Sequence, residues 1–224
     1  MKVKLVTGYV PIPGHPRTAK EYGDLGEKLG GVPVRKKCFY EKPSDMWLTK
    51  YISKLPFSPV PSGGDNPQKN SLLYHAVNHQ KSTWLVRAAD EDPDTDWLVW
   101  VDYGVFSQPN INNQIIYEMF DKLERTNDDA IYAPGCWDKP LVVEASYPCW
   151  RFAGSVIAVP KRMVDAFDFS CRVTARKHIS STKNVCWETN TWALVEKQGK
   201  LKFHCYKADH NATLFTAFPE PGQV

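Results

Sequence analysis

The chain has 224 residues, of which 42% are hydrophobic and 24% charged, so it can bury a sizeable core and is not intrinsically disordered. Its net charge of +3 is too small to indicate nucleic-acid binding through counterion release. Eight tryptophans are an unusually large number, and such side chains either fill a core or stack on flat and ring-shaped ligands.

The first part of the chain alternates apolar runs with turn-forming loops. Residues 3–10 predict a buried strand, which the Pro-rich segment PIPGHPR then ends. Ligands of open α/β sheets bind beyond the carboxyl ends of the strands, so residues 7–17 are a candidate binding loop. A short helix is expected over residues 21–31 and a second strand over residues 32–40. Residues 57–70 are rich in Pro, Gly, Ser and Asn and predict a surface loop.

The remaining pattern continues this alternation. Residues 71–90 predict one long amphipathic helix, for which Ser71 is the expected N-cap. The continuously apolar run at residues 97–101 is typical of a central strand buried on both faces. Further segments are expected as a helix (108–128), a strand (129–137), a strand (152–160), a helix (160–179), and a helix followed by a strand (190–211). The sequence therefore predicts a single α/β domain over residues 1–224, with a mixed, mainly parallel sheet and helices on both faces.

Cysteine spacing and hydropathy bear on the cellular setting. Six cysteines occur without a CxxC pair, which argues against a zinc ribbon or a thioredoxin-type site. The N-terminal residues lack the apolar region of a signal peptide, and no stretch approaches about 18 apolar residues. These features predict a cytoplasmic protein with reduced cysteines and no membrane span.

Asp102 is the first candidate for chemistry, because it directly follows the apolar run WLVWV. A carboxylate at the end of a buried strand is costly to desolvate unless it meets a cation or hydrogen-bond donors. A carboxylate that shares Mg²⁺ or Mn²⁺ with a diphosphate fits this position, and so does a simple turn cap. Gly104 would allow close approach of a ligand or a positive φ.

Several segments resemble the GT-A glycosyltransferases, and more narrowly the HtrL-type bacterial family and related phage sugar transferases. The resemblance rests on VTGYVPIP with a following Arg, WLVWVDYGVF, FAGSVIAVP, CWETNTWA and the late histidine of ADHN. It implies a GT-A-like, Rossmann-like fold and transfer of a sugar from a nucleotide-diphosphate sugar, of UDP type, to an acceptor hydroxyl. The acceptor stays open between a glycan, a protein and a modified DNA base.

The resemblance also implies a metal site for Mn²⁺ or Mg²⁺. Asp102 would be one ligand, although Gly104 stands where a second acid of the DxD motif is expected, so strict metal dependence is in doubt. A second ligand is implied near the C-terminus, where His210 is favoured over His204, which lies in an alternating strand pattern. A plain surface histidine is the alternative for His210.

The resemblance assigns donor and catalytic roles to further residues. Glu188 would be the catalytic base that takes the proton of the acceptor hydroxyl, or else an acid that stabilises a helix N-terminus. The small residues Ala153, Gly154 and Ser155 would leave room for the donor sugar, or would serve close strand packing. The full set of expected donor-binding residues is Thr7, Gly8, Tyr9, Arg17, Arg87, Asp102, Tyr103, Gly104, Ala153, Gly154 and Ser155.

Alternative functions stay open at this point. A sugar-phosphate nucleotidyltransferase would use the same fold, but it normally needs a Gly-rich basic loop after the first strand, which PIPGHPR matches poorly. A non-catalytic carbohydrate-binding module would use the tryptophans and would not need Asp102. His75 and His79, one helical turn apart, could bind a metal, but they lack the Glu of the zinc-protease motif.

Overall fold

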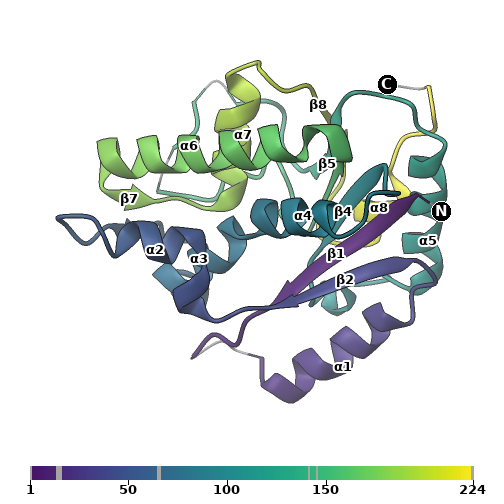
Figure 1. The fold of residues 1–224 in the computed structure, drawn as a ribbon, viewed down its shortest axis with the longest axis horizontal. Coiled ribbons are helices and arrows are strands. Elements are labelled where there is room, and N and C mark those ends of the chain that lie inside the picture. Colours follow the sequence, from purple (N-terminus) through teal and green to yellow (C-terminus); the bar gives the residue numbers. More distant parts are fainter. Residues whose placement is uncertain (1, 14–16, 65–66, 141, 145, 223–224) are drawn as a thin grey trace.

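The computed structural model describes residues 2–13, 17–64, 67–140, 142–144 and 146–222, and it is built around a six-stranded sheet (Figure 1). The strand order is β2-β1-β4-β6-β5-β8. Strand β6 is antiparallel to its neighbours β4 and β5, while the other neighbouring pairs are parallel. The strands are β1 (Val3–Tyr9), β2 (Arg35–Tyr40), β4 (Trp97–Val101), β5 (Ile131–Gly135), β6 (Val156–Pro160) and β8 (Phe203–Lys207). The predicted mixed, mainly parallel α/β sheet is confirmed.

Helices pack on both faces of this sheet. One face carries α2 (Trp47–Ile52), α3 (Leu72–His79), α4 (Lys81–Asp90), α6 (Val164–Thr182) and α7 (Glu188–Lys197). The other face carries α1 (Ala19–Gly30), α5 (Asn113–Glu124) and α8 (Thr213–Thr216). Two short strands, β3 (Val60–Pro61) and β7 (Asn184–Val185), form a separate parallel pair. Among the described helices, none is long and apolar enough to cross a membrane.

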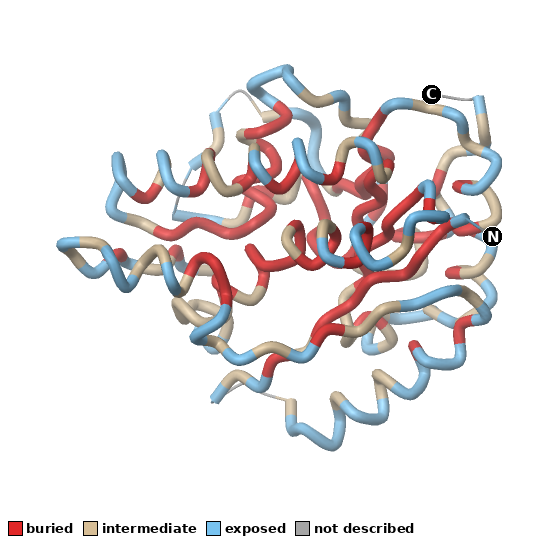
Figure 2. Tube along the Cα trace, viewed as in Figure 1, coloured by how far each residue is buried: buried red, intermediate tan, exposed pale blue. Residues whose placement is uncertain are grey.

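Strand β4 lies between the two halves of the hydrophobic core. Its side chains alternate, so that Leu98 and Trp100 pack on the α4 side while Trp97, Val99 and Val101 pack on the α5 side. All five are buried, as is most of the central sheet (Figure 2). This explains the continuously apolar run, because a strand covered on both faces has no solvent-facing position.

Sheet topology brings several loops to one edge. The chain passes from β1 outward to β2 and then returns to β4 on the other side of β1, which creates a crevice at the carboxyl ends of β1 and β4. Because β6 runs antiparallel to β4, Val156 at its start pairs with Val101 at the end of β4. The loops after β1, β4, β5 and β8 and the loop before β6 therefore meet at this edge.

One predicted element is wrong in its extent. Residues 71–90 form two helices, α3 and α4, instead of one, and the break falls at Gln80. The Ser71 side chain caps α3, as expected, by accepting a hydrogen bond from the Tyr74 amide. The Gln80 side chain is buried, accepts from the Trp47 amide and donates to Glu41. The break thus lies at a residue held by tertiary contacts, and it is not marked by a Gly or Pro in the sequence.

Candidate active site

A pocket of about 530 Å³ opens at the edge where the strand-end loops meet. Its walls come from the ends of β1 and β4, the start of β6, helices α3 and α4, and the N-terminus of α7. Of the residues expected at a donor, metal or catalytic site, those that line it are Gly8, Tyr9, Arg17, Asp102, Tyr103, Gly104, Gly154, Ser155, Glu188 and His210. The pocket therefore unites residues that are up to about two hundred positions apart in the chain.

Three expected site residues do not line this pocket. Thr7 and Ala153 are buried, and the Thr7 hydroxyl has no hydrogen-bond partner in the part of the chain that the structure describes. Arg87 lies on α4, where its guanidinium pairs with Glu41 at 3.2 Å and lies over the Phe39 ring at 4.7 Å. The candidate binding loop 7–17 is described except for residues 14–16, which lie outside the described residues.

Asp102 directly follows β4 and is held by both backbone and side chain. Its amide donates to the Ser155 carbonyl at 2.9 Å, which fixes the start of β6 against the end of β4. The Trp100 indole donates to Asp102 Oδ1 at 2.7 Å, and the Lys81 ammonium lies 3.0 Å from the same oxygen. The described residues show no hydrogen bond or ion pair to the second oxygen, Oδ2, which is therefore the oxygen left for a ligand. Asp102 is thus more than a turn cap.

Lys81 is the buried cation at the centre of the site. Its ammonium contacts Asp102 Oδ1, donates to Glu188 Oε1 at 2.9 Å and donates to the Gly154 carbonyl at 2.8 Å. Burial alone lowers the pKa of this ammonium, but the two carboxylates outweigh that effect and raise the pKa above its usual value. Lys81 therefore stays charged and joins α4, β4 and α7 in one ion cluster.

Glu188 begins helix α7 and is almost fully buried, with 3% of its surface exposed. Oxygen Oε1 is bound by Lys81, while Oε2 is buried and has no hydrogen-bond partner among the described residues. A buried carboxylate oxygen without a partner is costly and points to a function or a missing ligand. A Cβ atom on Gly154 would lie 2.3 Å from Oε1, so only glycine leaves room for this carboxylate.

Two cations flank the acidic groups. Arg17 donates to the Ser107 hydroxyl at 2.7 Å and lies against Gly104, where an added Cβ would meet its Nη1 at 3.0 Å. Gly104 has a φ of −94°, so the positive φ considered for it is wrong. Its lack of a side chain leaves room for the Arg17 guanidinium. Lys69 also lines the pocket, and burial lowers the pKa of its ammonium although Asp102 opposes this.

The pocket has one tyrosine wall and one tryptophan wall. Tyr9 lies 5.1 Å from Tyr22 and 5.2 Å from Tyr103, measured between ring centroids, and the pair with Tyr103 is stacked. A second aromatic group in the lining, the tryptophan wall, consists of Trp137, Tyr147, Trp150 and Trp187. Trp137 is 51% exposed, so its ring is accessible to a large ligand. Aromatic walls of this kind bind flat bases and the apolar faces of sugars.

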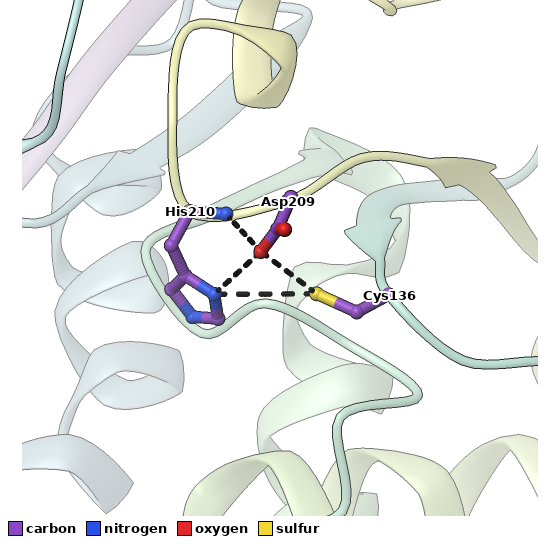
Figure 3. Close-up of side chains that lie close together, drawn as sticks. All are labelled: Cys136, Asp209 and His210. Atoms are coloured by element: carbon purple, nitrogen blue, oxygen red, sulfur yellow. Dashed lines mark hydrogen bonds and ion pairs between the residues drawn. The ribbon is translucent and has the colours of Figure 1, made fainter.

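His210 follows β8 and lies beside Asp209 and Cys136 (Figure 3). Its Nδ1 lies 3.4 Å from Asp209 Oδ1 and 4.0 Å from Cys136 Sγ, and its ring meets Trp150 edge-on at 4.8 Å between centroids. Within the described part of the chain, these three residues are the only group of potential metal ligands with all atoms within 4.8 Å. Asp102 and His210 therefore line one pocket without forming such a group together.

The histidine pair on α3 makes structural contacts. His75 Nε2 lies 3.2 Å from the Ser62 carbonyl and His79 Nε2 lies 2.9 Å from the Cys186 carbonyl. Burial lowers the pKa of both rings, that of His75 to about 4. These contacts connect α3 to the residues that follow β3 and β7. They explain why two histidines lie one helical turn apart without a metal between them.

Several residues of the site, among them Lys81, Lys69 and Tyr22, were not predicted from the sequence. Lys81 could have been predicted as a buried charge, because it lies four residues after Val77 and three before Trp84, on the apolar side of a predicted helix. Lys69 could not have been, since its loop is polar throughout. Tyr22 was included in a helix without a role, and its approach to Tyr9 depends on how α1 packs.

Comparisons with known proteins bear on the fold. No protein-family model matches the sequence, and no curated protein matches it significantly. The structure is similar to a glycosyltransferase involved in the glycosylation of the major capsid of PBCV-1, with 12% identity and a TM-score of 0.55 over 92% of this chain and 81% of that chain. It also aligns with 4-diphosphocytidyl-2C-methyl-D-erythritolsynthase from Anaerococcus prevotii, at 10% identity over 96% of this chain and 92% of that chain. The TM-score of that alignment is 0.44, which is too low to support a conclusion about this chain. The chain thus shares the fold of a glycosyltransferase.

Proposed function

We propose that this chain is a glycosyltransferase that moves a sugar from a nucleotide-diphosphate sugar, of UDP type, to an acceptor hydroxyl. The observation that carries the proposal is the ion cluster in which the buried Lys81 and Glu188 meet the partly exposed Asp102, in a pocket at the carboxyl ends of β1 and β4. Charged groups so deeply placed are expensive unless they serve binding or catalysis. The shared fold with a glycosyltransferase and the resemblance to the HtrL-type family support the same reading.

The two walls of the pocket suggest how a donor would lie. The tyrosine wall of Tyr9, Tyr22 and Tyr103 offers rings on which a nucleobase can stack. Arg17 lies over the Tyr22 ring at 5.8 Å, Lys69 is a second cation in the lining, and an arginine binds phosphate oxygens through two parallel hydrogen bonds. The sugar would then point toward Ser155 and Glu188, which also line the pocket.

Glu188 is proposed as the catalytic base. Once a side-chain movement exposes Oε2 to the pocket, the acceptor hydroxyl would lose its proton to it while the hydroxyl oxygen bonds to the anomeric carbon, and the bond from that carbon to the diphosphate would break. Lys81 holds the other oxygen, Oε1, and so fixes the carboxylate in place. The nucleoside diphosphate leaves with its electron pair. This role fits a single displacement.

Metal assistance is proposed at Asp102. The donor set fits Mn²⁺ or Mg²⁺, because a carboxylate with one oxygen still available can share such an ion with diphosphate oxygens. A bound divalent ion would neutralise charge that develops on the leaving diphosphate. Lys81, only 3.0 Å from Asp102, supplies a positive charge to this carboxylate in any case.

The tryptophan wall favours a sugar-containing acceptor. Trp137 and Tyr147 are 51% and 64% exposed and lie at the pocket, where their rings can stack on the apolar face of a pyranose. A glycan or a glycosylated base would use such rings.

We propose the whole chain, residues 1–224, as one catalytic domain.

Release of nucleoside diphosphate tests the proposed function. The full chain is incubated with UDP- and GDP-sugars, with and without Mn²⁺, and the free nucleoside diphosphate is measured. We expect release from at least one sugar donor and a loss of at least about a hundredfold in Glu188→Gln, as for removal of a general base. Pyrophosphate release from a nucleoside triphosphate and a sugar phosphate would instead indicate a nucleotidyltransferase, and no release from any donor would contradict the proposal.

A further inference from the structure

A cluster of three potential metal ligands lies where β5 and β8 end side by side. Cys136 follows β5, and Asp209 and His210 follow β8, whose last residues pair in parallel with those of β5. Figure 3 shows the three side chains converging from these two loops. Parallel neighbouring strands thus bring a thiol, a carboxylate and an imidazole together, although 72 residues separate Gly135 from Lys207 along the chain.

The separations of the three ligand atoms suit a small tetrahedral ion. Cys136 Sγ lies 3.8 Å from Asp209 Oδ1 and 4.0 Å from His210 Nδ1, and Oδ1 lies 3.4 Å from Nδ1. A point about 2.2 Å from all three atoms exists, and zinc bonds to sulfur, nitrogen and oxygen are about 2.0–2.3 Å long. An ion would therefore fit with shifts of only a few tenths of an ångström.

The ligands are held in place by contacts outside the cluster. The Cys136 amide donates to the Trp150 carbonyl at 3.0 Å, and the Trp150 ring meets the His210 imidazole edge-on. The Asp209 amide donates to the Thr213 hydroxyl at 2.9 Å, and within the cluster the His210 amide donates to Asp209 Oδ1 at 2.7 Å. Outer contacts of this kind orient ligands and commonly contribute ten- to a hundredfold to metal affinity.

We propose that Cys136, Asp209 and His210 form a Zn²⁺ site at the edge of the pocket, with the fourth position taken by water or a ligand. A thiolate together with an imidazole selects zinc over Mg²⁺ or Mn²⁺, which prefer oxygen. His210 then belongs to this site, and Asp102 would hold its own ion with diphosphate oxygens and water. Because His210 also lines the pocket, the zinc site would lie next to the bound donor or acceptor.

Cobalt binding tests this site without any sugar donor. Co²⁺ is titrated into the full chain, and the near-ultraviolet band of charge transfer from thiolate to cobalt is recorded. We expect the band in the wild-type chain and in Cys38→Ser, a matched control in which another partly buried thiol is removed, and its loss in Cys136→Ser. Asp209→Asn and His210→Ala should weaken binding at least about tenfold, and Zn²⁺ but not excess Mg²⁺ should abolish the band.

Proton release gives a second readout. Burial and the neighbouring Asp209 raise the pKa of the Cys136 thiol to about 11, so the thiol is protonated at neutral pH and must lose its proton when it binds the ion. We expect about one proton released per Zn²⁺ at pH 7 and tighter binding as the pH rises. Absence of the cobalt band in the wild-type chain, or its persistence in Cys136→Ser, would overturn the zinc site. The proposed transferase function would be unaffected, since it depends on nucleoside diphosphate release.

Discussion

The ammonium of Lys81, at the start of α4, lies 3.0 Å from Asp102 Oδ1, at the end of β4. The same ammonium binds Glu188, at the start of α7, so one buried cation connects the three elements that form the floor of the pocket. This arrangement means that Asp102 and Glu188 share Lys81 as their counter-ion and that its ammonium holds both carboxylates in position.

Removal of Lys81 should therefore destabilise the fold as well as the site. Lys81→Met leaves the buried Glu188 carboxylate without its counter-ion, and breaking a buried pair in this way costs about 3–5 kcal/mol. Urea denaturation would measure the loss. Lys20→Met, at an exposed position on α1, is the matched control and should change stability by less than about 0.5 kcal/mol.

A double variant separates charge from packing. Lys81→Met combined with Glu188→Gln removes one of the two unpaired charges, so it should recover part of the stability lost in Lys81→Met alone. Equal stability of the single and double variants would contradict the ion cluster described here.

Gly154→Ala should disturb the proposed base. The new methyl group would lie 2.3 Å from Glu188 Oε1 and would displace this carboxylate from Lys81. We expect turnover to fall at least about tenfold, because displacement by about 1 Å can cost a hundredfold, while nucleotide affinity changes little. Steady-state kinetics would check this. Gly23→Ala is the control, since a Cβ there meets no atom within 4 Å and alanine favours the helix.

The two arginines predicted from the sequence should differ in their effects. Arg17 lines the pocket, so Arg17→Ala should weaken nucleoside diphosphate binding by about tenfold to a hundredfold through loss of a charged hydrogen bond. Arg87 pairs with Glu41 away from the lining, so Arg87→Ala should leave that affinity unchanged. Calorimetric titration of both variants would compare them, and a large effect at Arg87 would restore the sequence-based expectation.

His75 should make stability depend on pH. Burial lowers its pKa to about 4, below the value of about 6.5 expected in the unfolded chain. Between these values the unfolded chain binds more protons, so folding stability falls as the pH falls from about 6.5 toward 4. The contribution of His75 should be about 2 kcal/mol lower at pH 5 than at pH 7.5. His75→Gln, which can still donate to Ser62, should lose this part of the pH dependence in urea denaturation.

The sequence predicted the sheet and one side of the site because both leave local patterns. A continuously apolar run followed by an acid places Asp102 at a strand end, and the acid after CW begins a helix as expected for Glu188. Both side chains line one pocket, which the spacing alone could not show. The confirmed α/β class follows from the same alternation of strand and helix patterns.

The remaining features depend on packing that has no local signal. The break at Gln80 results from side-chain contacts with the loop and helix around Glu41 and Trp47. Cys136 and His210 meet because β5 and β8 are neighbours, and strand order cannot be derived from the spacing of the strands. Lys81 was detectable only as a charge on an apolar helix face.

Equilibrium binding of nucleotide-diphosphate sugars tests the central claim most directly. Calorimetric titration of the full chain with UDP- and GDP-sugars, with and without Mn²⁺, should give saturable binding of at least one donor. Asp102→Asn should weaken that binding at least about tenfold, because the carboxylate no longer carries the charge that Lys81 and a metal ion require. Failure of every donor to bind, or equal binding by wild type and Asp102→Asn, would contradict a nucleotide-sugar site at Asp102.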